Sequence, residues 1–127
     1  RVVALRRHIG ALLDAVVSGD RPSDGALDAI NDALRHAPSY PQLRWTNTGA
    51  CIDTVRSGDH DVQLLAAIAD VSGEYLSSDQ AAATRRCEAP DCEMLFSPTH
   101  PRRRWCSPTV CGNRTRVARY YDRHKVT

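Results

Sequence analysis

Cys87-Glu-Ala-Pro-Asp-Cys92 and Cys106-Ser-Pro-Thr-Val-Cys111 are two matched cysteine pairs in the last third of a chain of 127 residues. Each pair encloses four residues, and thirteen residues separate the two pairs. Zinc in structural sites takes four ligands at tetrahedral corners, and thiolates about 2.3 Å from the metal are common among them. A proline in each loop stiffens the bend that brings its two cysteines together. The spacing therefore predicts one structural Zn²⁺ held by Cys87, Cys92, Cys106 and Cys111.

Two other states of these cysteines remain open, namely disulfide bonds and thiols without a ligand. The chain shows neither a secretory leader nor an apolar run of membrane-spanning length, so we expect a cytoplasmic protein, in which metal ligation is favoured over disulfides. A centre closed by four thiolates leaves no position for water or substrate. Because no nucleophile with a neighbouring base is visible either, we expect no enzyme.

The segment between the two pairs holds two short runs on either side of a turn. Residues 94–96 and 103–105 are expected to pair as a hairpin, with Pro98 and Pro101 in the turn between them. The second cysteine pair then leads into a helix. A cysteine loop, a hairpin and the start of a helix that converge on one metal form a treble-clef-like arrangement.

Charge divides the chain near the same place. Residues 1–84 hold seven Lys and Arg against eleven Asp and Glu, whereas residues 85–127 hold ten against four. A basic segment of this kind suggests contact with nucleic acid or another polyanion. Two other interpretations stay open: a solvated charged surface, and positive charge that compensates the four thiolates.

The helix expected after Cys111 has one basic face. At 100° per residue, three of its arginines fall in one sector, which could lie in a DNA groove or along phosphates. With two arginines that precede Trp105, the candidate nucleic-acid contacts are Arg103, Arg104, Arg116, Arg119 and Arg123. Arg114 falls in the apolar sector, so we expect it to pair with a carboxylate or a backbone carbonyl. Beside the metal, we expect Gly112 to leave room for backbone and Asn113 to serve as a cap or in a tight turn.

Residues 1–84 form a mildly acidic body in which helices are expected first. Apolar residues recur at helical spacing over 5–17 and again over 27–34. Ser23 or Asp24 can cap the second of these helices. The two helices are therefore expected to form an antiparallel helical hairpin.

Residues 43–55 are rich in strand-forming residues, which predicts a short β-hairpin around Asn47-Thr48-Gly49. A third helix is expected after Asp59, and a polar segment over 77–84 leads to the cysteines. Two strands alone do not make a stable sheet, so this hairpin needs helix packing or further strands, from an upstream segment or a second copy. The predicted fold class is α+β, with a helical N-terminal part that carries a short β-hairpin, followed by a small treble-clef-like zinc finger with four cysteine ligands.

Five stretches carry a resemblance to the CGNR zinc-finger family of bacterial proteins: Arg85-Arg86-Cys87, Cys92, Leu95-Phe96, Arg103-Arg104-Trp105-Cys106 and Cys111-Gly112-Asn113-Arg114. These proteins are regarded as stress-induced transcription regulators. The resemblance covers residues 85–125 and implies a zinc finger there, whereas residues 1–84 resemble more loosely the latter part of that family's N-terminal domain. Because an amphipathic pattern is already under way at Arg1, we expect 1–84 to be a truncated regulatory domain and 85–127 to be the finger with its basic helix.

Cysteines, charge and resemblance together predict a zinc-dependent, DNA-binding transcription regulator. Its expected partners are DNA, a second copy of the chain and an unknown small-molecule effector of the N-terminal domain, and no membrane is expected. The other candidate is a protein-interaction or dimerisation module that zinc holds together and that binds no DNA. Affinity measured against salt concentration distinguishes the two, because phosphate contacts make DNA binding salt-dependent.

Overall fold

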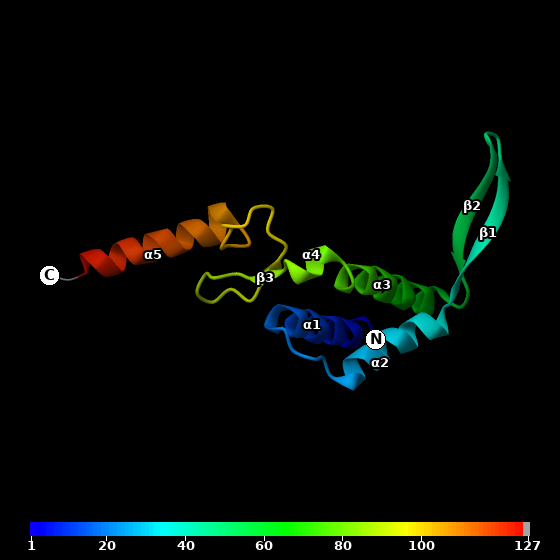
Figure 1. The fold of residues 1–127 in the computed structure, drawn as a ribbon, viewed down its shortest axis with the longest axis horizontal. Coiled ribbons are helices and arrows are strands. Elements are labelled where there is room, and N and C mark those ends of the chain that lie inside the picture. The colour runs from blue at the N-terminus through cyan, green and yellow to red at the C-terminus, as the bar shows by residue number, and fades with distance from the viewer. Residues whose placement is uncertain (126–127) are drawn as a thin grey trace. The chain divides into compact units, whose positions relative to one another are not determined.

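The protein folds as two compact units, whose elements can be followed along the chain in Figure 1. The computed structural model describes residues 1–125. The first unit is Arg1–Ser78, built from helices and a β-hairpin, and the second begins at Asp79 and contains two short strands, the cysteine pairs and one long helix. These elements confirm the predicted α+β class. Within residues 1–125, no helix combines the length and the apolar character that crossing a membrane requires.

Three helices make the body of the first unit: α1 (Val2–Ser18), α2 (Asp24–His36) and α3 (His60–Leu76). α1 ends at Gly19, which takes the left-handed conformation with φ of 72° that glycine adopts at little cost. α2 begins where the Ser23 hydroxyl accepts a hydrogen bond of 3.3 Å from the Ala26 amide, as the sequence predicts. Local sequence therefore determines both ends of the connection between α1 and α2.

The three helices bury a small aliphatic core between them. Each helix contacts the other two. Leu12 of α1 is only 3% exposed, and Ala66 and Ala69 of α3 are completely buried. The small alanine side chains let α3 approach its neighbours closely. The buried cluster and the apolar side chains packed against it are Leu5, Leu12, Ala26, Ile30, Ala69, Ile9, Ala33, Leu34, Leu65, Ile68 and Leu76.

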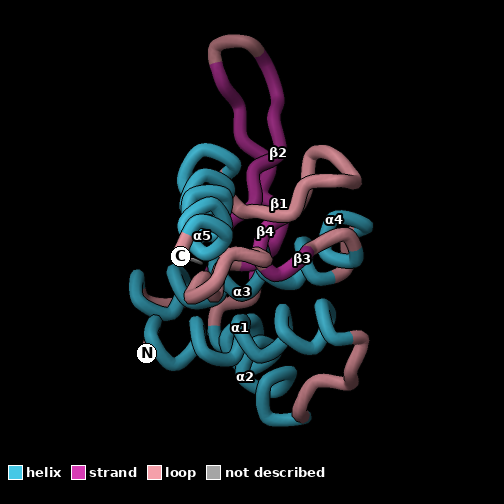
Figure 2. The backbone as a smooth tube through the Cα atoms, turned by 90° about the vertical axis from the view of Figure 1, so that its left-hand side faces the viewer, coloured by secondary structure: helices cyan, strands magenta, loops and turns pink. Residues whose placement is uncertain are grey.

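An antiparallel hairpin, β1 (Ser39–Thr46) and β2 (Gly49–Arg56), stands away from these helices, as both Figure 1 and Figure 2 show. The predicted turn is confirmed, but the strands are longer than the sequence suggests, since β1 runs through Pro41. Arg56 anchors the base of the hairpin. Its guanidinium donates a hydrogen bond of 3.2 Å to the Ala37 carbonyl and forms an ion pair with Asp70 of α3.

The second unit has only short elements before its long helix: α4 (Asp79–Ala82), β3 (Arg85–Arg86), β4 (Leu95–Phe96), the π-helical turn η1 (Pro108–Gly112) and α5 (Asn113–His124). α4 lies in the segment expected to be only a polar link. Ala81 and Thr84 beside it are buried. The segment before the cysteines is therefore an ordered part of this unit.

The prediction that residues 94–96 and 103–105 pair as a hairpin is wrong, because β4 pairs with β3 instead. The Cys87 amide extends this pairing with a hydrogen bond of 2.9 Å to the Met94 carbonyl. β3 ends directly before Cys87, so the β3–β4 pairing closes the first cysteine loop at its root. The β3–β4 pairing encloses residues 87–94 and with them the whole first cysteine loop, which the predicted hairpin would have left open.

Candidate metal centre

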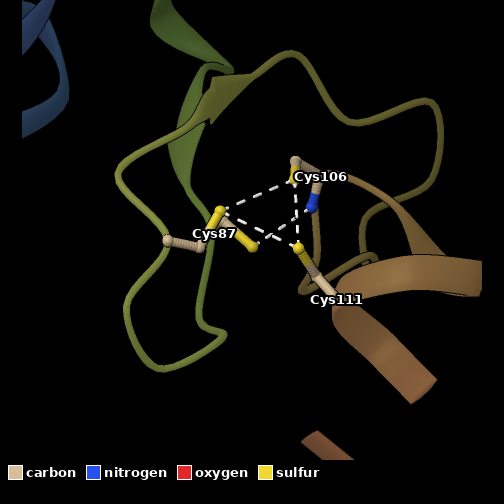
Figure 3. A group of neighbouring side chains, drawn as sticks. Cys87, Cys106 and Cys111 are labelled. Carbon is tan, nitrogen blue, oxygen red and sulfur yellow. Dashed lines mark hydrogen bonds between the residues drawn. The ribbon is translucent and has the colours of Figure 1, made fainter. Parts of the chain in front are cut away.

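The four paired cysteines come together in the second unit. Their Sγ atoms all lie within 4.8 Å of one another. Figure 3 shows Cys87 on the first loop, Cys106 on the segment before the helical ribbon and Cys111 at the ribbon, with their sulfurs converging. The Sγ of Cys106 lies 3.6 Å from that of Cys111 and 3.8 Å from that of Cys92. A tetrahedron with metal–sulfur bonds of about 2.3 Å has edges of about 3.8 Å. All of these cysteines are free thiols. The spacing therefore fits one tetrahedrally bound ion and not a pair of disulfides.

The first cysteine loop contains a tight turn. The Cys92 amide donates a hydrogen bond of 3.2 Å to the Ala89 carbonyl. Pro90 supplies a fixed φ at the second position of this turn, and Asp91 takes a positive φ of 59° at the third. Aspartate tolerates this conformation better than bulkier residues do. The turn reverses the chain so that both cysteines of the pair reach the same centre.

The second cysteine loop is part of the start of a helix. The Ser107 hydroxyl accepts a hydrogen bond of 3.2 Å from the Val110 amide, and its carbonyl accepts one of 3.0 Å from the Gly112 amide. The resulting turn, η1, continues without a break into α5. Inside that run, the Thr115 hydroxyl donates to the Cys111 carbonyl at 2.8 Å. A metal ion held by Cys111 would therefore fix the direction of α5 relative to the loops.

The thiols of the centre do not ionise independently of one another. Burial of Cys87 opposes its thiolate, but backbone amides of Cys106 and Ala89 donate to its sulfur, and they lower its pKa to about 7. The neighbouring Cys111 thiol, together with burial, raises the pKa of Cys106 to about 12. The centre thus accommodates one negative charge easily and resists further ones. A divalent cation would relieve this repulsion, and four sulfur donors suit a soft or borderline metal.

Trp105 packs against the start of α5. A Cβ at Gly112 would lie 3.2 Å from Cε3 of the indole ring. The guanidinium carbons of Arg104 and Arg116 lie 5.5 and 5.6 Å from the ring centroid, within cation–π range. Gly112 therefore leaves room for the indole, and not for backbone beside the thiolates as the sequence suggested. Within residues 1–125, the buried indole Nε1 has no hydrogen-bond partner.

Arg103 holds the segment before the second cysteine pair, a role that sequence reasoning missed. Its Nε donates a hydrogen bond of 3.0 Å to the Trp105 carbonyl, and its Nη2 donates to the Cys106 carbonyl. Its guanidinium carbon also lies 5.2 Å from the centroid of the Phe96 ring. The only signal in the sequence was its place in the Arg-Arg-Trp-Cys run, which does not distinguish a structural arginine from one that contacts a ligand.

Arg104 is paired across the first loop. Its Nε lies 2.6 Å from Oε2 of Glu88, and the hydrogen bond holds the pKa of Glu88 below its usual value. The positive charges of Arg119 and Arg85 lower this pKa further. A single carboxylate thus lies among several arginines, and Arg119 of α5 is close enough for its charge to affect it.

Asn113 and Arg114, which follow Cys111 and Gly112, make hydrogen bonds inside the second unit. Arg114 donates a hydrogen bond of 3.1 Å to the Pro90 carbonyl, a backbone partner of the expected kind. Asn113 has helical backbone angles, and its side-chain oxygen accepts a hydrogen bond of 3.1 Å from Arg116. The capping role expected for it falls to Ser107, because η1 and α5 form one helical run that begins after Ser107.

The distal part of α5 carries the remaining candidate contacts. Arg119 and Arg123 are exposed, and Nε of Arg123 donates a hydrogen bond of 3.2 Å to the Arg119 carbonyl. The Tyr120 ring stacks on His124, with 4.1 Å between the centroids. The structure thus separates the five candidate arginines: three contact groups inside the finger, and two lie beyond them on exposed helix.

Two comparisons with known families agree with this arrangement. Residues 84–124 match the family described as CGNR zinc finger, and residues 1–79 match the ABATE family, described as "Putative stress-induced transcription regulator". No curated protein matches the chain at a significant level. The two matches together cover almost all of the described residues, and the ABATE match ends within one residue of the boundary between the two units. The chain therefore belongs to the ABATE family and carries a CGNR zinc finger, in which four cysteines lie within metal-binding distance of one another.

Proposed function

We propose that this protein is a DNA-binding transcription regulator of the bacterial cytoplasm, in which Zn²⁺ held by Cys87, Cys92, Cys106 and Cys111 orients α5 toward nucleic acid. One observation carries the proposal: the last of the four clustered sulfurs belongs to the residue that leads into the basic helix. Four of the twelve residues of α5 are arginine, and its only acid is Asp122. The centre and the basic helix are thus covalently and geometrically one element.

The zinc would act as a structural ion. Its binding would replace the apolar core that this unit lacks, since the unit's buried cluster consists of Cys87, Ala89 and Cys111 with a few partly buried neighbours. Four thiolates fill a tetrahedral coordination sphere, so the residues around the ion position α5 and perform no chemistry. We accordingly propose no catalytic activity, which also fits the names of both matching families.

The five candidate arginines differ in the part that we assign to each of them in DNA contact. Arg119 and Arg123 are the contacts we assign first, because they are exposed on the outer part of α5. Arg116 lies over the Trp105 ring, so we assign it a lesser part in the contact. Arg103 and Arg104 already bond to carbonyls and to Glu88, so we assign them a supporting part. In this proposal the first unit, Arg1–Ser78, supplies the regulatory function.

Fluorescence anisotropy of a labelled DNA duplex, measured at several salt concentrations, tests this function. Each lost phosphate contact lowers the slope of log affinity against log salt by about 0.9. The double variant Arg119→Ala/Arg123→Ala should therefore bind more weakly, with a slope lower by about 1.8. Arg6→Ala/Arg7→Ala removes the same charge from exposed positions of α1 and should leave the slope unchanged.

Zinc analysis and a circular dichroism spectrum show that each variant is loaded and folded before titration. Unchanged affinity and slope in Arg119→Ala/Arg123→Ala would remove α5 from the DNA contact. If the zinc-loaded wild-type protein binds no duplex at physiological salt, the alternative function holds, a protein-interaction module that zinc holds together.

A further inference from the structure

The β1–β2 hairpin has one face that carries an ion pair and an opposite face that exposes large apolar side chains. Arg44 and Asp53 form an ion pair on the first face. On the other face, Leu43 is 70% exposed, Trp45 82% and Ile52 70%. Figure 2 shows the hairpin extending beyond the helices of its own unit. A hairpin of two strands is only marginally stable by itself in water, so a partner on this element would stabilise it.

The two edges of the hairpin also differ. The Ser57 amide donates a hydrogen bond of 3.2 Å to the Pro38 carbonyl, and from there every second residue pair exchanges ladder hydrogen bonds. The alternation leaves outward-pointing backbone groups at residues 41, 43 and 45 of β1 and at 50, 52 and 54 of β2. Pro41 has no N–H to donate, so the β1 edge is interrupted. Within residues 1–125 no third strand pairs with either edge, and β2 presents both backbone groups at three alternate residues, 50, 52 and 54.

We propose that β2 pairs antiparallel with β2 of a second copy of this chain, about a two-fold axis at Ile52. In this register Ala50 lies opposite the partner's Thr54, and three residue pairs exchange about six backbone hydrogen bonds. Asp53 lies opposite the partner's Cys51 and Arg56 opposite the partner's Thr48, so no charge faces its like. The β2 edge is uncharged at residues 50, 52 and 54 and is self-complementary in this register, so it fits a second copy of itself.

The same register makes the apolar face continuous. Leu43 and Ile52 are direct neighbours within the hairpin, and across the axis Ile52 meets the partner's Ile52. Trp45 lies opposite Ala50, whose small side chain leaves room for the indole to extend toward the partner's Thr54. The four-stranded sheet therefore sets these apolar side chains beside one another, and the lateral contacts reduce the surface that each exposes.

The partner's turn would reach the base of the hairpin, opposite Arg56 and Ser57. An open groove of about 420 Å³, lined mainly by apolar side chains of α1, α2 and α3, includes His36 and Val62 at this end of the unit. A Cβ placed at Gly58, which follows the hairpin, would lie 2.7 Å from Cγ2 of Val62, so the groove and the hairpin base are neighbours. The groove gives the partner's turn an apolar surface to contact.

Sedimentation analysis of the zinc-loaded full chain tests this proposal without reference to DNA. The wild-type protein should sediment with twice the chain mass of 14.0 kDa. Ala50→Glu/Thr54→Glu sets carboxylates opposite each other across the axis and should weaken the dimer at least tenfold. Ala50→Lys/Thr54→Glu sets opposite charges there and should restore it. Tyr40→Glu/Val71→Glu adds the same two charges at exposed positions away from the β2 edge and should leave the dimer intact.

Hydrogen exchange gives a second readout that needs no variant. The amides of Ala50, Ile52 and Thr54 should be protected, and their protection should increase with protein concentration. A monomer at every concentration, or equal dimer affinity in the Glu/Glu and Lys/Glu variants, would overturn the proposal. Unprotected amides at these three positions would overturn it independently, even if a substituted chain failed to fold.

Discussion

The two units of this protein are held together in different ways. The first unit, Arg1–Ser78, packs three helices around aliphatic side chains such as Leu12 and Ile30. In the second unit, the buried cluster contains the cysteines themselves, with Phe96 and Trp105 at its margin. A segment with so little apolar surface to bury would gain its stability from the metal in the function proposed above. The comparison shows that one chain can combine a unit with an aliphatic core and a unit whose buried cluster is formed by cysteines. We therefore expect that each unit can be disrupted separately.

Cys106→Ser should produce the largest effect, confined to the second unit. Loss of one ligand removes most of the metal-binding free energy, which is about 10–16 kcal/mol for structural zinc in finger peptides. The signals of α5 should disappear from an NMR spectrum, while those of α1 to α3 remain. Cys51→Ser is the matched control because Cys51 lies on β2, outside the cluster. Retention of α5 in metal-free Cys106→Ser would show that the second unit has another source of stability.

Acidification should release the metal and unfold the second unit. Metal-bound thiolates have pKa values far below those of free thiols, so the metal-free state binds more protons. The stability that the metal provides is therefore complete above about pH 8.5, the pKa of an unfolded cysteine, and is lost as the pH falls through the lowered pKa values of the bound state. Competition with a chelator at several pH values measures this, and more than one proton should be taken up per ion released. An affinity independent of pH would contradict ligation by thiolates.

Leu12→Ala should destabilise the first unit by about 2–5 kcal/mol, because it leaves a cavity in the aliphatic core. Urea unfolding followed by the helical signal of α1 to α3 checks this value. The metal affinity of the second unit should not change. Leu64→Ala is the control, since Leu64 is 54% exposed and its loss leaves no cavity. A change in metal affinity in Leu12→Ala would mean that the two units are energetically coupled.

Arg114→Ala should have the smallest effect, about 1 kcal/mol on the second unit, because it removes one hydrogen bond to the Pro90 carbonyl. Thermal unfolding of the zinc-loaded protein, followed by Trp105 fluorescence, measures it. Arg102→Ala, in the exposed loop before the second cysteine pair, is the matched control. Equal melting temperatures for the two variants would show that the bond to Pro90 contributes nothing measurable.

The clustering of the four cysteines and the helices of the first unit could be predicted from the sequence, because both depend on short-range patterns. Cysteine spacing and loop prolines are local, and so are the Ser23 cap and the apolar stripe around Leu12. Whether each of the four cysteines ligates the ion stays a prediction until a metal is measured.

Pairings between distant short segments were not accessible in the same way. Two-residue strands carry no periodicity, so nothing in the sequence distinguished Arg85–Arg86 from residues 103–105 as the partner of β4. Arginines posed a similar problem. Arg103 inside the finger and Arg123 on the exposed helix contribute equally to the basic composition of residues 85–127. Their structural and exposed positions are distinguished by their hydrogen bonds in the structure.

X-ray absorption at the zinc edge of the purified chain tests the central claim most directly. The account predicts one zinc per chain, surrounded by four sulfur atoms at about 2.3 Å and by no nitrogen or oxygen. A folded α5 in a metal-free chain would contradict it, as would a coordination sphere that contains light atoms in place of one of the four cysteines.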